Sequence, residues 1–407
     1  MKRGQILIVA LALALVACGS DVAQTAVRPD VPAPFDCRKT NEPVTLPTDP
    51  ALGGGDEPSS SPLLGGSYGA GQGPGIGIVA RDGFRLYQNG ELVAERTESL
   101  VPEFFPLTFL PGDNVVSVVT SSPDRAPALL VHVDELERAY VSDGSWKVST
   151  APNGDFRLPG YDASDWDDAF DHGLAVATPG CEPPAGFVPG STAHWIGTRD
   201  ESARTAVFRL AFRIAPLGFG ALTTGGQNAT PVVARDVDEI AMLLTSDEPA
   251  IILVPEERFD ARRTGDEIAM LEACPIPCSD GSDQITYTAL PDGPCEEPLV
   301  PLPRDERRLT TGPNKTLVGL GRGSILRGVS LTISQTQNVI VRNLAFYDVN
   351  PEIIEAGDGV TIEASSRVWL DHLTFRWIGD GFVDVIPGST DLTLSWLHFD
   401  GRSEFAC

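Results

Sequence analysis

The chain has 407 residues, which predicts two or three domains at about 150 residues each. Hydrophobic residues make up 42% of it, and its 41 glycines and 34 prolines stay below the share typical of low-complexity chains, so wholesale disorder is excluded. The formal net charge of −26 argues against a nucleic-acid-binding protein, because a phosphate backbone requires clustered Lys and Arg.

The N-terminus has the pattern of an export signal. Lys2 and Arg3 precede an apolar stretch over 6–17 that is too short to span a ~30 Å hydrocarbon layer comfortably. The stretch ends in the letters LVAC, which resemble the lipobox of bacterial lipoproteins, with Cys18 as the lipidated residue. We therefore interpret 1–17 as a lipoprotein signal peptide. The chain is then expected to be exported and anchored to the cell envelope by lipid; an ordinary secretory peptide with unmodified Cys18 is the alternative.

The next two regions differ in pattern. Residues 18–65 are rich in Pro, Asp, Ser and Gly without apolar periodicity, which predicts a flexible linker. Residues 66–215 contain short strand-like runs separated by turn signals. Phe84–Tyr87 and Glu91–Val93 flank an Asn-Gly turn, which is typical of a hairpin. Short strands at this spacing predict an antiparallel β-sandwich.

Further runs support the sandwich. Val115–Val119 follows a Pro-Gly turn, and Ala128–Val133 and Val207–Ile214 are a candidate strand pair. The phrases Ser142–Trp146 and Tyr161–Asp168 resemble galactose-binding-like jelly rolls attached to glycan-degrading enzymes. A tryptophan in such a phrase could stack on a sugar ring or lie in the core, and we assign none of them to a ligand.

Beyond residue 216 the pattern changes again. An apolar face over 237–244 predicts a helix, and Ile251–Val254 predicts a short buried strand. Residues 258–310 are acidic and are expected to be irregular.

An internal repeat follows. Three nine-residue lines superpose without gaps, and they are 338–346, 367–375 and 391–399. Thr316–Val318 aligns with Val339–Val341 as a further copy. A repeat of about 20–30 residues with several short β-runs per unit predicts a solenoid whose coils stack their strands in parallel.

Six cysteines remain besides Cys18, and they are Cys37, Cys181, Cys274, Cys278, Cys295 and Cys407. An even number in an exported chain predicts disulfides, although six cysteines allow fifteen pairings. The spacing of Cys274 and Cys278 with Cys295 would also suit a metal site. Its Pro/Asp-rich setting without a nearby His favours disulfides.

Four motifs make the repeat region specific. They are Asn314–Gly319, Val341–Leu344, Val368–His372 and Asp380–Asp384, the last followed by Gly-Ser. With these motifs residues 216–407 resemble the pectate lyase and pectin lyase family of polysaccharide lyases. The resemblance implies a right-handed parallel β-helix, so the whole chain is expected to be all-β.

The resemblance also implies a chemistry. The family cleaves polygalacturonan by β-elimination: a base removes the proton α to the uronate carboxylate, and the C4–O bond then breaks without water. A calcium ion can stabilise the negative charge that then develops on the uronate carboxylate. The family's calcium ligands correspond here to Asp358, Asp380 and Asp384, although solvated turns are the alternative for these acids. Asp371 and His372 match a family signature that hydrogen-bonds within the coil.

The sequence also departs from the family. Twenty positions after Asp384 stands Glu404, where the calcium-dependent branch has a substrate-binding Lys. The tail instead resembles the pectin lyase branch, which acts on methyl-esterified pectin without calcium but carries Arg at the position of Asp380. Arg402 and Arg376 are candidates for the missing positive charge, with solvated surface arginines as the alternative.

The family's catalytic Arg would lie beyond Cys407. We therefore assign no catalytic residue and expect the β-helix to be incomplete at its C-terminus, with strand edges and apolar side chains exposed on the last coil. The sequence predicts a monomeric, lipid-anchored lyase that acts with Ca²⁺ on acidic polysaccharide outside the cytoplasm. The alternatives are a non-catalytic glycan-binding lipoprotein, which Glu404 favours, and an adhesin.

Overall fold

The structure is a computed structural model. It describes residues 74–402 except 100, 137, 175–186, 189, 279–283, 290–292 and 322–323. The predicted signal peptide with Cys18, the whole predicted linker over 18–65 and Glu404 lie outside the described residues, as do Cys37, Cys181 and Cys407. No helix in the described part is long and apolar enough to cross a membrane.

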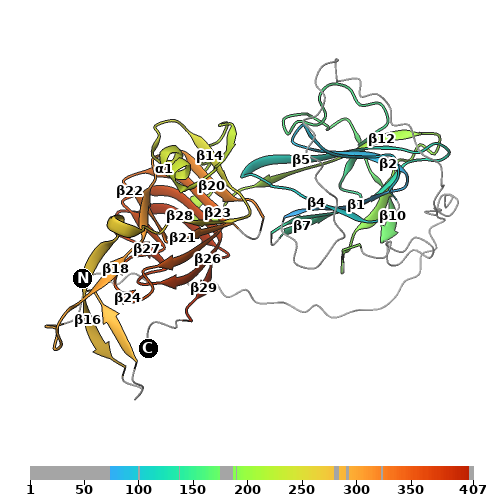
Figure 1. Cartoon of the computed structure of the whole chain (residues 1–407). Coiled ribbons are helices and arrows are strands. Elements are labelled where there is room, and N and C mark those ends of the chain that lie inside the picture. The colour runs from blue at the N-terminus through green and yellow to red at the C-terminus, as the bar shows by residue number, and fades with distance from the viewer. Residues whose placement is uncertain are drawn as a thin grey trace, which may run out of the picture. The chain divides into compact units, whose positions relative to one another are not determined.

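The strands between Gly75 and Ile214 form two six-stranded antiparallel sheets (Figure 1). The first sheet contains β1 (Gly75–Ala80), β4 (Glu103–Pro106), β6 (Ala128–Glu135), β7 (Arg138–Val141), β10 (Phe170–Leu174) and β11 (His194–Gly197). The second contains β2 (Gly83–Gln88), β3 (Glu91–Arg96), β5 (Gly112–Ser121), β8 (Lys147–Ser149), β9 (Asp167–Asp168) and β12 (Thr205–Ile214). Buried side chains of both sheets share one core. The antiparallel sandwich is therefore confirmed.

The turn chemistry of the sandwich is also confirmed. Asn89 and Gly90 join β2 to β3 with φ of 51° and 100°, the left-handed backbone that this hairpin turn requires. The expected pairing of 128–133 with 207–214 is wrong, because β6 pairs with β1 and β11 while β12 pairs with β5 and β8. Two apolar runs of similar length carry no information on which sheet each one joins.

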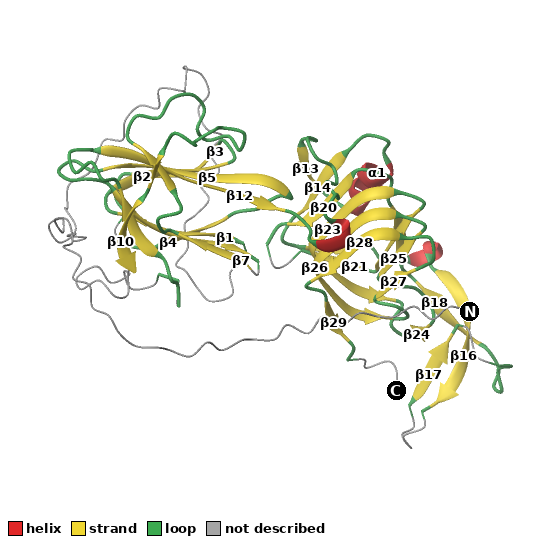
Figure 2. Ribbon diagram, turned by 180° about the vertical axis from the view of Figure 1, so that it is seen from behind, coloured by secondary structure: helices red, strands yellow, loops and turns green. Residues whose placement is uncertain are grey.

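The repeat region is a solenoid of parallel strands, and Figure 2 shows the strands of successive coils side by side. Its longest sheet contains β13 (Pro231–Val233), β14 (Ala250–Val254), β15 (Arg258–Asp260), β20 (Lys315–Gly319), β21 (Ile325–Arg327), β23 (Gln337–Val349), β26 (Ser366–Ile378), β28 (Thr390–Ser395) and β29 (His398–Asp400). A second parallel sheet contains β19 (Arg307–Thr310), β22 (Val329–Ser334), β25 (Val360–Glu363) and β27 (Val383–Val385).

The register of the coils confirms the alignment of the three nine-residue lines. Val339 pairs with Val368, and Val368 pairs with Leu392. The alignment of Thr316 with Val339 is wrong by one position, because Thr316 pairs with Ile340. A slip of one residue would turn every side chain to the opposite face. The observed register instead stacks Leu317 on Val341 in the buried core.

Each long strand bends at a residue that leaves the ladder. Asn343, His372 and Trp396 occupy equivalent positions of three successive coils with φ of 54°, 50° and 52°. Asparagine adopts this left-handed backbone readily, while His and Trp do so at a cost that the neighbouring coils must offset. Behind the bend, Phe346, Phe375 and Phe399 form a column with ring centroids 5.5 and 5.6 Å apart, in which Phe346 and Phe375 are buried.

The predicted helix is α1 (Val237–Thr245), and it contacts β14 and β19 with its apolar face buried in the solenoid core. Asp236 caps it by accepting a hydrogen bond from the Glu239 backbone N–H at 2.8 Å. On the last described coil, Val385, Leu394 and Phe399 are exposed.

The expectation of an irregular segment over 258–310 is wrong. This segment contains β15, β19 and a sheet of β16 (Ala269–Pro277), β17 (Ile285–Thr288), β18 (Val300–Arg304) and, from the next coil, β24 (Ile353–Ile354). Proline and charged residues interrupt the alternation that would have revealed these strands. The predicted disulfide chemistry is confirmed, since Cys274 is bonded to Cys295.

Candidate functional site

Stacked coils bring the three predicted aspartates into one neighbourhood. Asp358 precedes β25 and Asp384 lies in β27, and these two strands are parallel neighbours in which Thr361 pairs with Asp384. The Asp358 carboxylate accepts a hydrogen bond from the Thr361 hydroxyl at 2.6 Å and another from the Gly381 N–H at 3.1 Å. Asp358 is therefore fixed by its own turn and by the coil that carries the other two acids.

Gly381 shows how closely the carboxylates approach. A Cβ atom at this glycine would lie 2.1 Å from Asp384 Oδ1 and 3.1 Å from Asp358 Oδ1. Both distances are shorter than an ordinary Cβ contact, so two carboxylates from different coils border the same glycine. The glycine of the Asp-Gly-x-x-Asp motif thus leaves room for the Asp384 carboxylate in its observed position.

A fourth carboxylate, Glu355, belongs to the cluster, and sequence reasoning missed it. Its backbone N–H donates to Gly379 O at 3.0 Å, beside Asp380 on the next coil. Partial desolvation, followed by the negative charges of Glu355, Asp358 and Asp384, raises the pKa of Asp380. Desolvation and the charges of Asp358 and Glu355 likewise raise the pKa of Asp384. The interval from Glu355 to Asp380 matches the coil repeat and could have revealed this residue.

The cluster combines the right ligand type with an open geometry. Carboxylate oxygens are the ligands that Ca²⁺ prefers, and mutual repulsion is what a divalent cation would relieve. Within the described ranges, however, no three His, Cys, Asp or Glu side chains converge closely enough to hold a metal ion. The four acids border one region without enclosing a single point.

The two candidate substrate-binding arginines lie elsewhere. Arg402 donates two hydrogen bonds to the Asp400 carboxylate at 2.8 and 2.7 Å, and Arg376 Nε lies 3.7 Å from the same group. The Arg402 guanidinium holds the pKa of Asp400 well below its usual range. Arg376 also packs over the ring of Trp377. Asp400 thus pairs with both arginines, and no contact among the described residues joins either arginine to the acidic cluster.

Asp371 and His372 hydrogen-bond within the solenoid, as predicted. The buried Asp371 carboxylate accepts from Arg342 Nε and the Ser395 hydroxyl, each at 2.6 Å, and contacts His372 Nδ1 at 2.7 Å. Burial alone would raise the pKa of Asp371, but the hydrogen bond from His372 and the charge of Arg342 lower it below its usual value. This network ties three successive coils together.

Comparison with protein families matches residues 303–395 to the pectate lyase family. The matched pectate lyase segment contains the whole acidic cluster and the network around Asp371.

The curated relatives include proteins named probable pectin lyases. Probable pectin lyase F of Emericella nidulans is 35% identical over 200 residues, covering 47% of this chain and 42% of the relative. Probable pectin lyase D of Aspergillus niger is 32% identical over 220 residues, covering 50% of this chain and 58% of the relative. The chain therefore spans about half the length of the curated relatives it matches.

Solved structures of pectate lyases are also similar to this chain. The pectate lyase of Paenibacillus sp. 0602 is 20% identical with a TM-score of 0.31, covering 46% of this chain and 42% of that one. The pectate lyase of Bacillus sp. N165, solved in complex with trigalacturonate, is 18% identical with a TM-score of 0.28, covering 47% of this chain and 56% of that one.

Proposed function

We propose that this chain is part of an exported polysaccharide lyase that cleaves polygalacturonan by β-elimination. The observation that carries the proposal is that the segment matching the pectate lyase family contains four carboxylates gathered from successive coils. An acidic polysaccharide is the substrate that this family implies, and the two curated relatives are named pectin lyases.

The four acids would hold Ca²⁺ between protein and substrate. When bound, the cation would offset the uronate carboxylate's charge and make the α-proton more acidic. This chain's own residues would position the ligands: Asp358 is held in place by Thr361 and Gly381, and Asp380 and Asp384 provide carboxylates with raised pKa. The protein's charge of −26 makes such a cation necessary, because the acidic cluster alone would repel a polyanion.

Export and attachment follow from the sequence pattern of the N-terminus. We expect Cys18 to carry the lipid and the mature protein to act as a monomer on the outer side of the membrane. Metabolic labelling with a fatty-acid analogue tests this expectation, since a Cys18→Ser variant should lose the label.

A second candidate function is glycan binding without catalysis. It is favoured by Asp400, which occupies both arginines that would otherwise present positive charge to the substrate. The mature chain would then bind polygalacturonate and leave it intact.

One experiment separates the two functions. Polygalacturonate and methyl-esterified pectin are incubated with the protein, with added Ca²⁺ or with a chelator, while the ultraviolet absorbance of the unsaturated uronate product is followed. Product that depends on Ca²⁺ supports the lyase. Retained binding of polygalacturonate without product, in the presence of Ca²⁺, supports the binding protein instead.

Calcium binding has its own readout, independent of turnover. Titration calorimetry should give a Kd of about 10⁻⁴–10⁻³ M, the range of extracellular calcium modules. Asp380→Asn should weaken it. Asp391→Asn is the matched control, because Asp391 lies on β28 of the solenoid and contacts its neighbour Thr390. No calcium binding by the unmodified protein at millimolar concentration would contradict the role proposed for these acids.

A further inference from the structure

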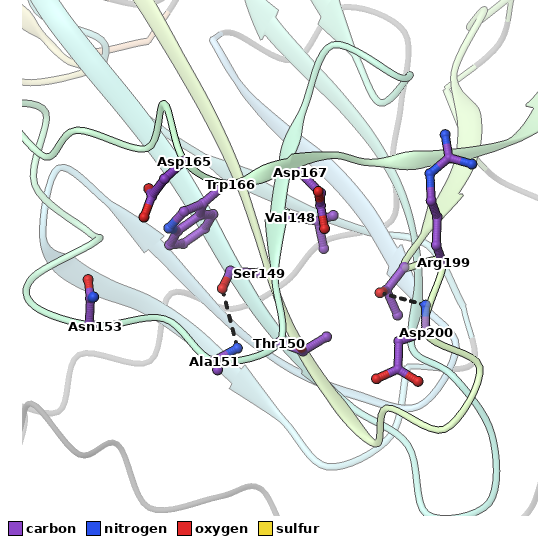
Figure 3. Close-up of a pocket in the computed structure, with 11 residues that line it drawn as sticks. Val148, Ser149, Thr150, Ala151, Asn153, Asp165, Trp166, Asp167, Arg199 and Asp200 are labelled. Carbon is purple, nitrogen blue, oxygen red and sulfur yellow. Dashed lines mark hydrogen bonds between the residues drawn. The ribbon is translucent and has the colours of Figure 1, made fainter.

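A pocket of about 470 Å³ opens on the sandwich, where no function has been assigned (Figure 3). It lies beside β8 and β9, which pair with each other at the edge of the second sheet, and the turn that follows β11 closes it. This volume is within the range of about 300–1,000 Å³ that small-molecule sites occupy.

The floor of the pocket is apolar and rigid. Val148 and Trp166 line it and are buried. Trp166 packs against Phe156 and Tyr161 with ring centroids 6.2 and 5.7 Å away, and its indole N–H lies 3.3 Å from the Tyr161 hydroxyl. That hydroxyl donates in turn to Asn153 Oδ1 at 2.9 Å on the pocket wall. The floor is thus fixed without a ligand.

The walls of the pocket carry both hydrogen-bond acceptors and a hydrogen-bond donor. Asp165 and Asp167 are exposed, and their carboxylates have no hydrogen bond or ion pair with any described residue, so both are free to accept. Arg199 packs over the ring of Phe170 at 5.0 Å and forms no ion pair within the described part of the chain, so its guanidinium is free to donate. Figure 3 shows these three side chains around the same pocket.

Other groups of the wall are already engaged. The Asp200 carboxylate accepts from the Ser202 N–H at 2.9 Å and from its hydroxyl at 2.6 Å. The Ser149 hydroxyl oxygen accepts from the Ala151 N–H at 3.3 Å, which leaves its own hydrogen to donate. These contacts hold the turn at Asp200, which carries the neighbouring Arg199, and the turn that follows Ser149.

The charge of the pocket selects among ligands. Three carboxylates face one guanidinium, so the pocket is net negative and would repel a uronate. The Arg199 guanidinium on the same wall opposes a bound cation. Free acceptors and a free donor around an apolar floor suit a neutral molecule whose hydroxyls both donate and accept and whose C–H face packs on carbon.

We propose that the pocket formed by Val148, Asp165, Trp166, Asp167 and Arg199 binds a neutral sugar unit and discriminates against uronates. The sandwich thus recognises a different component of a glycan from the one that the solenoid is proposed to cleave. The two proposals stand on different residues, and either can fail without the other.

Calorimetry on the full chain tests the proposal with four neutral disaccharides, namely galactobiose, arabinobiose, cellobiose and mannobiose. Digalacturonate is the anionic comparison and glucosamine the cationic one. At least one neutral disaccharide should bind more tightly than digalacturonate, and its affinity should change little with salt, because no net charge is neutralised.

Two variants locate the site. Asp165→Asn and Arg199→Ala should each weaken sugar binding about tenfold, since each removes hydrogen bonds to a charged group. Asp113→Asn and Arg213→Ala are the matched controls, because these exposed residues pair on β5 and β12 of the same sandwich, outside the pocket. Their affinity should equal that of the unmodified protein.

Three results would overturn the proposal: no neutral disaccharide binds at millimolar concentration, digalacturonate or glucosamine binds more tightly, or the pocket variants bind the sugar as well as the control variants do. Thermal midpoints measured on all four variants show whether a loss of binding reflects unfolding, and in that case Asp167→Asn replaces the unfolded variant.

Discussion

The solenoid and the sandwich build their sites by different means. In the solenoid, successive coils stack at a nearly constant repeat, so chain spacing specifies the proximity of Glu355, Asp358, Asp380 and Asp384. In the sandwich, Asp165 and Arg199 line one pocket although no repeat relates them. A regular stack converts sequence distance into spatial distance, whereas an antiparallel sandwich does so only through its particular topology.

The two regions also differ in how their cores are connected. Each coil of the solenoid packs on its neighbours, and Phe346, Phe375 and Phe399 form one such column. The sandwich closes two sheets on a shared core that includes Phe208. The destabilisation caused by a core substitution should therefore stay local in the solenoid and extend through both sheets of the sandwich.

The largest expected effect comes from truncating the aromatic column. Phe375→Ala should destabilise the solenoid by about 3–5 kcal/mol, because a fully buried ring leaves a cavity between two coils. Phe208→Ala is the matched change in the sandwich, where the ring is equally buried. Hydrogen exchange should rise mainly in β23, β26 and β29 for the first variant and throughout both sheets for the second. An increase in hydrogen exchange that extends equally far in both variants would contradict this difference between solenoid and sandwich.

A smaller effect should follow from Lys315→Met. Lys315 is fully buried, and its ammonium donates to Ser246 O at 2.7 Å, to the Ser246 hydroxyl at 3.0 Å and to Glu248 O. Its loss leaves the part-buried carbonyls of Ser246 and Glu248 without this donor, which should cost about 1–3 kcal/mol of unfolding free energy. Lys147→Met in the sandwich removes only an exposed pair with Asp168 and should cost less than about 1 kcal/mol by denaturant titration.

Removing one charge from the acidic cluster should stabilise the protein rather than destabilise it. Without calcium, Asp380→Asn should raise stability at neutral pH by less than about 1 kcal/mol, because it removes like-charge repulsion at a largely exposed site. Asp391→Asn, the control on β28, should have no such effect. Thermal unfolding in a chelator measures both variants, and a destabilised Asp380→Asn protein would argue against repulsion among these acids.

The same cluster predicts a pH dependence. The pKa values of Asp380 and Asp384 are raised in the folded state, so as the pH falls from neutral the folded protein takes up protons before the unfolded chain does. Without calcium the cluster's penalty is therefore present above the raised pKa values and relieved below them. Calcium affinity should fall over the same interval, because protonated carboxyls are poor ligands. Calorimetry and thermal unfolding across that interval should show opposite trends.

The smallest effect on stability is expected from Gly381→Ala. The added methyl group would overlap the Asp384 carboxylate, which is exposed and can turn away, so unfolding free energy should change by less than about 0.5 kcal/mol. Calcium affinity should nevertheless fall, since the carboxylate leaves its place beside Asp358. Gly401→Ala is the control because a Cβ there meets no atom within 4 Å. Equal calcium affinity in the two variants would contradict the placement of Asp384 in the site.

The sequence alone determined the all-β fold, the hairpin at Asn89-Gly90 and the helix over 237–244. It also determined the stacking of 338–346 on 367–375 and of 367–375 on 391–399. These features depend on local turn chemistry or on a repeat, and both are readable from neighbouring or regularly spaced residues. The three aspartates, in contrast, were assigned from the resemblance to the pectate lyase and pectin lyase family.

Only the tertiary structure decided the rest. It paired β12 with β5 rather than with β6, formed strands within 258–310, added Glu355 to the acidic cluster and engaged Arg376 and Arg402 with Asp400. Each of these outcomes depends on which distant segment fills a given space. Apolar runs of similar length are interchangeable until the core is packed, and a charge finds its partner only when the chain has folded around it.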